Sequence, residues 1–180
     1  MPRGRIEVIT GGMFSGKSEE LVRRLRREGF ARKSIRAVKH ASDCRYHETH
    51  IGCHGGQTFE ALPVKDAEAL VRQVAGFEVV GIDEGQFFGD DLPDACEHLA
   101  NAGVLVIVAG LDLTAEGKPF HPMPALMAIA EDVTKLRAVC VVCGEKACRS
   151  HHLAGKDVDV EVGAKSYEAR CRGCWKDAIG

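Results

Sequence analysis

An eight-residue pattern near the start of the chain constrains the fold more than any other feature. Residues 11–18 match G-x-x-x-x-G-K-[S/T] at every fixed position. Residues 5–10 before them predict a short strand, and the spacing of Leu21, Val22 and Leu25 after them predicts a helix. A glycine-rich turn in this context lets backbone N–H groups surround a phosphate at the positive end of the helix. The residues expected to bind a nucleoside triphosphate such as ATP are Gly11, Gly12, Met13, Phe14, Ser15, Gly16, Lys17 and Ser18.

An acidic residue closes a second buried strand. The run Val79–Asp83 is apolar until Asp83, and Glu84 follows directly. An acid at the carboxyl edge of such a sheet lies over the same crevice as the phosphate pattern. We therefore expect Lys17 to contact the β- and γ-phosphates, and Ser18 with Asp83 to hold Mg²⁺. Glu84 is then free to take a proton from an acceptor hydroxyl, or to position water in an NTPase.

The middle of the chain alternates strand and helix patterns. Cys96 and Leu99 are expected to face inward from the second of two helices, and residues 104–110 are apolar enough for a central parallel strand. The expected elements are a strand at 35–38, helices at 66–74 and 92–102, and strands at 79–83 and 104–110. This order predicts an α/β fold, a P-loop NTPase-like parallel sheet with helices on both faces.

Four cysteines near the C-terminus form two C-x-x-C pairs. These are Cys140 with Cys143, and Cys171 with Cys174. Four thiolates on two such turns predict a closed tetrahedral Zn²⁺ site, which has no open position for water and is therefore structural. A redox role is less favoured, because one C-x-x-C pair would be enough for it.

The same region contains Cys148, His151 and His152, which are further ligand candidates that we interpret as surface-loop residues. Short strands are predicted at 158–162 and 167–170. The change in composition near Ala138 predicts a nucleotide-binding domain at residues 1–137 and a small zinc-ribbon-like domain at residues 138–180.

Charge and hydropathy exclude several other classes of protein. The formal net charge of −2 predicts no general attraction to nucleic acid or acidic membranes. The arginines at positions 23, 24, 26 and 27 are interpreted as a solvated helix face. No segment has the length of a membrane span or a signal peptide, and a reducing compartment favours metal binding by the eight cysteines. We therefore expect a cytoplasmic protein that binds neither nucleic acid nor membrane.

Taken together, the motifs resemble the thymidine kinase family of the cellular, zinc-containing type (type II). The resemblance runs from about Glu7 to Cys174. It rests on the order and spacing of five segments, at residues 11–20, 83–88, 109–112, 118–120 and 166–174.

The resemblance implies roles for particular residues. Glu84 matches the catalytic base of the family, and Gln86 belongs to the same nucleotide-binding segment. Asp43 and Arg45 match a D-x-R segment near the phosphates. The residues that match the wall of the thymine pocket are Met13, Phe87, Leu111 and Phe120. Those that match the loop closing over the nucleoside, the lasso, are Val158, Asp159, Val160, Glu161, Val162 and Tyr167.

The resemblance also implies an activity and an assembly. It implies ATP-dependent phosphorylation of thymidine with Mg²⁺, a structural Zn²⁺, a homotetramer and feedback by thymidine triphosphate. The chain departs from the family at Ala115, where an aromatic residue is common, and at His152, where an arginine is usual. These departures lie on the acceptor side, so deoxyuridine or an analogue is an alternative acceptor.

Two other functions compete with this one. The segment 83–86 also resembles a helicase motif, which would suit a nucleic-acid-dependent ATPase, but a second motor domain and interleaved aromatic residues are lacking. A nucleotide sensor or scaffold without activity is the other alternative. The intact set of Lys17, Ser18, Asp83 and Glu84 favours an enzyme over it.

Overall fold

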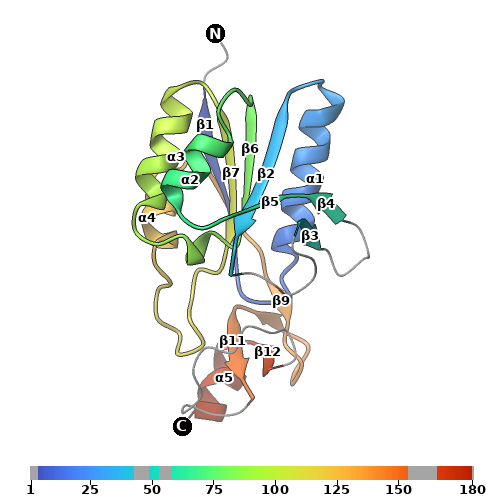
Figure 1. Cartoon of the computed structure of the whole chain (residues 1–180). Helices are drawn as coiled ribbons and strands as arrows, with labels where there is room; N and C mark the ends of the chain where they lie inside the picture. The colour runs from blue at the N-terminus through green and yellow to red at the C-terminus, as the bar shows by residue number, and fades with distance from the viewer. Residues whose placement is uncertain (1–3, 43–48, 53–57, 154–165, 180) are drawn as a thin grey trace.

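A six-stranded sheet forms the larger part of the computed structural model, which describes residues 4–42, 49–52, 58–153 and 166–179 (Figure 1). Each pair of neighbouring strands is parallel. In sheet order the strands are β5 (Leu62–Val64), β2 (Ile35–His40), β6 (Val79–Asp83), β7 (Leu105–Gly110), β1 (Arg5–Thr10) and β8 (Asp132–Lys135). The predicted parallel α/β sheet is confirmed.

Helices cover both faces of this sheet. The helix α1 (Lys17–Phe30) lies on one face, while α2 (Ala67–Gln73), α3 (Leu92–Asn101) and α4 (Met123–Ile129) lie on the other (Figure 1). Each face has its own apolar core, because alternate strand residues point to opposite sides. Val79 of β6 packs with α1, for example, whereas Val80 packs with α2 and α3. The expected helices on both faces are therefore present.

Local sequence signals explain where one helix begins and why parts of other elements are buried. Asp66 caps α2, since its side chain accepts a hydrogen bond from the Ala69 N–H at 2.7 Å. Cys96 and Leu99 of α3 are buried, as predicted from their spacing. All six residues of β7 are buried, as expected for a central parallel strand. A short 3₁₀ turn, η1 (Gly85–Phe87), follows β6.

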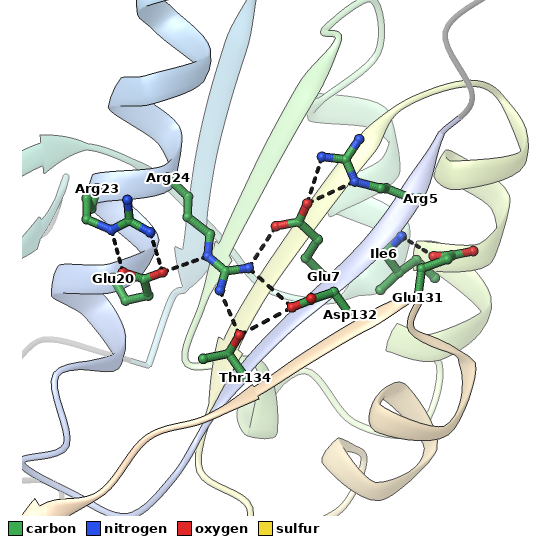
Figure 2. A network of polar contacts seen from close by, with 9 residues as sticks. All are labelled: Arg5, Ile6, Glu7, Glu20, Arg23, Arg24, Glu131, Asp132 and Thr134. Carbon is green, nitrogen blue, oxygen red and sulfur yellow. Dashed lines mark hydrogen bonds and ion pairs between the residues drawn. The ribbon is translucent and has the colours of Figure 1, made fainter.

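Arg24 connects α1 to the edge of the sheet (Figure 2). Its guanidinium donates to Glu20 within the helix, to Glu7 on β1 at 2.7 Å and to Thr134 on β8 at 2.8 Å. Asp132 lies 3.7 Å from the same group. The side chain of Arg24 is only 16% exposed, so the interpretation of the arginine run as a solvated face is wrong at this position. Arg24 donates to acceptors on three different elements, whereas a solvated arginine donates mainly to water.

The C-terminal part forms separate small elements beyond the carboxyl ends of the strands (Figure 1). They are β9 (Ala138–Val139), β10 (Lys146–Ala147), β11 (Arg149–His152), β12 (Tyr167–Arg170) and α5 (Arg172–Ile179). β9 pairs with β10, and β11 with β12, both antiparallel. The division at 137/138 stays a prediction, and it falls between the last strand of the large sheet and β9.

One further hairpin, β3 (His50–Gly52) with β4 (Thr58–Glu60), lies beside α1 (Figure 1). Its residue Ile51 belongs to the core on the α1 face. Among the described residues, no helix combines the length and the apolar character that crossing a membrane requires.

Candidate active site

The phosphate loop, residues 11–18, joins β1 to α1 in the predicted strand-loop-helix context. Gly16 precedes the helix with φ 85°, and Gly11 has φ 143°, where a Cβ would lie 2.4 Å from the Leu136 carbonyl oxygen. These two positions therefore require glycine. Lys17 is 9% exposed, and its Nζ donates to the Gly12 carbonyl oxygen at 2.8 Å. The loop thus places a buried ammonium group next to the positively polarised amino end of α1.

Asp83, at the end of β6, contacts this loop. The Ser18 hydroxyl lies 3.1 and 3.2 Å from the two Asp83 carboxylate oxygens. Asp83 is 5% exposed, so its charge faces the site and little solvent. Hydroxyl and carboxylate oxygens are the ligands that Mg²⁺ prefers. The two residues are therefore chemically suited to hold that ion.

Glu84 follows Asp83 in an uncommon backbone conformation, with φ 55°. Such conformations are costly outside glycine and concentrate at functional sites. The Gln86 side chain donates from Nε2 to the Glu84 carboxylate and accepts from the Leu111 N–H at 3.0 Å. Gln86 is 4% exposed. The structure places Gln86 where it holds Glu84 against the end of β7, whereas the sequence grouped it with the nucleotide contacts.

Aromatic side chains gather around Phe87, whose backbone N–H donates to the Glu84 carbonyl oxygen at 3.0 Å. The rings of Phe87 and Phe120 meet edge to face, with centroids 6.3 Å apart. The centroid of the His40 ring also lies 6.3 Å from that of Phe87. The backbone N–H of Phe120 donates to the Asp112 carbonyl oxygen at 2.9 Å, which brings Phe120 close in space to Leu111. Three of the four predicted pocket residues therefore lie together.

Met13, the fourth, contacts the C-terminal part of the chain. Its backbone N–H donates to the Ser150 hydroxyl on β11 at 3.0 Å. A Cβ on Gly12 would lie 3.5 Å from the same hydroxyl. The phosphate loop and β11 are thus in direct contact.

The four cysteines of the two C-x-x-C pairs gather in one place, as predicted. Their sulfur atoms all lie within 4.8 Å of one another, and those of Cys143 and Cys171 are 3.7 Å apart. Tetrahedral zinc with Zn–S bonds of about 2.3 Å requires sulfurs about 3.8 Å apart. We call Cys140, Cys143, Cys171 and Cys174 the thiol cluster.

The electrostatics of the thiol cluster also suit a divalent cation. Backbone N–H groups, first that of Cys171, lower the pKa of the Cys140 thiol to about 6. Hydrogen bonding to Cys171 raises the pKa of Cys174 to about 12. Neighbouring thiolates repel one another, so a cation is needed for all four to ionise. The cluster is therefore consistent with a zinc-binding site.

The other ligand candidates lie outside the thiol cluster. His151 and His152 belong to β11, and Cys148 directly precedes it, so they lie in or beside a strand where the sequence suggested a surface loop. The His152 ring meets Tyr167 of β12 edge to face, with centroids 4.8 Å apart. Of the predicted lasso residues, Tyr167 thus lies on β12 against His152. The others, at 158–162, lie outside the described residues. Asp43 and Arg45 also lie outside them.

Sequence reasoning missed three residues around this site. Lys39 is 1% exposed at the carboxyl end of β2, in register with Asp83. The sequence signal that could have found it is a lysine directly after the strand predicted at 35–38. Ser150 and Trp175 contact the phosphate loop and the segment after β7, respectively. Neither contact leaves a signal in the sequence, because both join segments that lie far apart along the chain.

A phosphate loop before α1 and an acid at the end of β6 define a P-loop nucleotide-binding protein of the α/β class. A solved archaeal structure, the flagellar accessory protein FlaH from Methanocaldococcus jannaschii, has the same fold. It aligns with a TM-score of 0.55 at 14% identity, over 81% of this chain and 76% of that one.

Relatives in sequence define the family. The thymidine kinase family model matches residues 4–175. A thymidine kinase from Bdellovibrio bacteriovorus is 51% identical over 98% of this chain and 88% of its own length. One from Bacteroides fragilis is 47% identical over 98% and 89%. The chain belongs to the thymidine kinase family, as the resemblance predicted.

Proposed function

We propose that this chain transfers the γ-phosphoryl group of ATP to the 5′-hydroxyl of thymidine, giving ADP and thymidine monophosphate. The relatives are named for this activity. The observation that carries the proposal is the Ser18–Asp83 contact at 3.1 Å. It joins the phosphate loop to the end of β6, directly before Glu84. The γ-phosphate of a triphosphate bound to the loop would therefore lie close to the Glu84 carboxylate.

The donor side consists of the phosphate loop and Asp83. Lys17 and the amides of residues 11–18 bind the β- and γ-phosphates. Ser18 and Asp83 would hold Mg²⁺, and that ion would supply positive charge against the transferring group. The resemblance adds Asp43 and Arg45 on the phosphate side.

Glu84 acts as the general base. Its carboxylate takes the proton of the 5′-hydroxyl as that oxygen forms a bond to the γ-phosphorus. The bond between the γ-phosphorus and the bridging oxygen breaks, and the electron pair leaves with ADP. Gln86 keeps the Glu84 carboxylate in place during this transfer, since it donates to that group from a buried position.

The acceptor side is apolar, as a pyrimidine base requires. Phe87, Leu111 and Phe120 provide flat and aliphatic surface beside Glu84, and Met13 borders the phosphate loop. By the resemblance, the lasso at residues 158–162 and Tyr167 close over the nucleoside and exclude water from the γ-phosphate.

We further propose a structural zinc ion in the thiol cluster, a homotetrameric assembly and a cytoplasmic location. Feedback by thymidine triphosphate belongs to the same proposal. Such an inhibitor would occupy the acceptor pocket with its base and reach the phosphate loop with its phosphates. Inhibition assays and light scattering test these two points.

Transfer of labelled γ-phosphate from ATP to thymidine tests the activity. We expect labelled thymidine monophosphate from the wild type and none from Lys17→Met. Deoxyuridine in place of thymidine measures how strict the acceptor site is. Hydrolysis of ATP that DNA or RNA stimulates, without product on thymidine, would make the chain an ATPase. Nucleotide binding without any turnover would make it a sensor.

A further inference from the structure

Trp175 is the one tryptophan of the chain, and it joins the thiol cluster to a loop of the large domain. It follows Cys174 directly in α5, and its backbone N–H donates to the Cys171 carbonyl oxygen at 3.0 Å. Its indole Nε1 donates to the Ala115 carbonyl oxygen at 3.1 Å. Two sulfur ligands of the proposed zinc site therefore fix the backbone of a residue that contacts a segment 60 positions away.

The segment that Trp175 contacts is a small hairpin at residues 113–119, the acceptor hairpin. Leu113 and Pro119 form a bridge, and the Thr114 N–H donates to the Lys118 carbonyl oxygen at 2.8 Å. Gly117 turns the chain with φ 75°, and a Cβ there would lie 2.8 Å from Cη2 of Trp175. The indole ring thus lies against the hairpin backbone, in contact that a side chain at position 117 would prevent.

Arg149 holds the indole from the side of the C-terminal domain. Its guanidinium carbon lies 5.4 Å from the centre of the Trp175 ring, and Arg149 is 8% exposed. A cation over an aromatic face is attractive, more so when both are shielded from water. The next residue, Ser150, accepts the Met13 N–H of the phosphate loop. Two successive residues of β11 therefore contact the indole and the phosphate loop.

The acceptor hairpin connects two residues of the proposed thymidine pocket. Leu111 precedes it and Phe120 follows it, and the Phe120 N–H donates to the Asp112 carbonyl oxygen at its base. Asp112 is 3% exposed, and its carboxylate pairs with Lys135 at 2.6 Å. The base of the hairpin is thus anchored to the sheet, while Trp175 holds its tip.

We propose that Trp175 is a positioning residue: it transmits the order of the thiol cluster to the acceptor hairpin and so fixes the thymidine pocket. The part that concerns thymidine rests on the proposed function. Trp175 touches neither the phosphate loop nor Glu84 in any contact described above. Its loss therefore weakens acceptor binding and leaves ATP binding intact.

Three variants with a matched control test the kinetic part. Trp175→Phe removes the indole N–H, Trp175→Ala removes the ring as well, and Gly117→Ala displaces the ring with Trp175 present. Lys176→Ala, an exposed neighbour on α5, is the control. We expect the KM for thymidine to rise about tenfold in Trp175→Ala, with a smaller rise in Trp175→Phe. The KM for ATP and the zinc content should match the control.

Tryptophan emission gives a readout that is independent of activity. With one tryptophan in the chain, the emission maximum reports the environment of this ring alone. We expect a red shift in Gly117→Ala at normal zinc content, and the same shift in the wild type when a chelator removes zinc. Failure of the wild type to phosphorylate thymidine would defeat the proposed function, but the emission experiment would still decide whether Trp175 couples the two segments.

Three results would overturn the coupling. The first is an unchanged KM for thymidine in Trp175→Ala. The second is an emission maximum that neither Gly117→Ala nor zinc removal shifts. An equal rise in both KM values together with loss of zinc would also overturn it, because Trp175 would then only stabilise the C-terminal domain.

Discussion

Glu84, the proposed base, is held in place by its neighbours. Its φ of 55° puts its backbone in the left-handed region directly after β6. Conformational cost at this position is offset by the hydrogen bond from Gln86, which itself is fixed by the Leu111 N–H. A base that is already oriented loses little further freedom when the acceptor binds.

Glu84→Gln keeps the shape of the side chain and removes its basicity. We expect kcat for thymidine phosphorylation to fall by about 10²–10⁴-fold, the usual contribution of a general base. ATP affinity should stay within about twofold, because the phosphate loop is untouched. Steady-state kinetics and nucleotide titration measure the two quantities. Glu97→Gln, an exposed carboxylate on α3, is the control, and near-normal turnover of Glu84→Gln would reject the role of base.

The roles of residues that belong to a sequence motif could be predicted. The roles of residues that depend on contacts with distant segments could not. Lys17, Ser18 and Asp83 stand at fixed places in motifs, and the structure brings them together. Arg24 and Trp175 carry no such mark. Each acquires its environment from segments more than ten positions away along the chain.

At the scale of elements, the edge of the sheet beyond β1 depends on polar contacts as well as apolar packing. Only four residues make up β8, and Val133 among them is 43% exposed. Arg24 reaches from α1 across β1 to Thr134 on β8 (Figure 2). The helix that starts at the phosphate loop is thereby tied to the strand at the sheet edge.

Arg24→Met retains the aliphatic stem and removes the charge. We expect a loss of about 1–3 kcal/mol in the free energy of unfolding, because Glu7 and Thr134 lose the Arg24 donor in a half-buried site, although Glu7 keeps Arg5. Chemical denaturation measures it. Arg23→Met is the matched control: Arg23 also pairs with Glu20, but its side chain is 61% exposed. The control should cost clearly less than Arg24→Met, because exposed ion pairs contribute little to stability, and equal losses in the two variants would contradict the assignment.

The same network predicts a dependence of stability on pH. Hydrogen bonds from Arg23 and Arg24 lower the pKa of Glu20 from 4.5 to about 2. Because the folded state favours the ionised form, this contribution is complete above pH 4.5 and is lost as the pH falls towards 2. The wild type should exceed Glu20→Gln in unfolding free energy by roughly 1 kcal/mol at pH 6, and the gap should close at low pH.

Urea unfolding of the two proteins across that pH range measures the gap. High salt should narrow it, since partly exposed ion pairs are screened. A gap that is the same at pH 6 and pH 3 would show that Glu20 stabilises the helix without its charge.

Long buried elements were predictable, and so was the short strand β12, predicted at 167–170, but most other short or edge strands were not. The strands β6 and β7 are continuous apolar runs, and their predicted bounds differ from the observed ones by at most one residue. The strands β3, β4, β5 and β8 have three or four residues each, too few for a periodic pattern. β5 and β8 form by pairing with β2 and β1, which lie far away along the chain, and such pairing leaves no local pattern.

At the scale of the whole molecule, the two parts of the chain are stabilised differently. The sheet has an extensive apolar core on each face. In the described residues of the C-terminal part, the buried hydrophobic core consists of Ala138, Cys140, Ala147 and Ala169, with Cys171 and Cys174 packed against them. So small a core rarely supports a fold without a metal or a cross-link. Its exposed valines at 139, 141 and 142 add nothing to that core.

Removal of zinc should therefore unfold one part and spare the other. We expect about one zinc per chain in the purified protein, and much less in Cys143→Ser, while Cys148→Ser, outside the thiol cluster, keeps the metal. After chelation, limited proteolysis should cut within residues 138–180 and leave a resistant fragment that ends near residue 137, because the two large cores do not depend on the thiol cluster. Mass spectrometry of the fragments locates the cuts. Zinc-free protein that resists the protease as well as the native form, or that is degraded throughout, would contradict both the structural role of the metal and the division of the chain at this point.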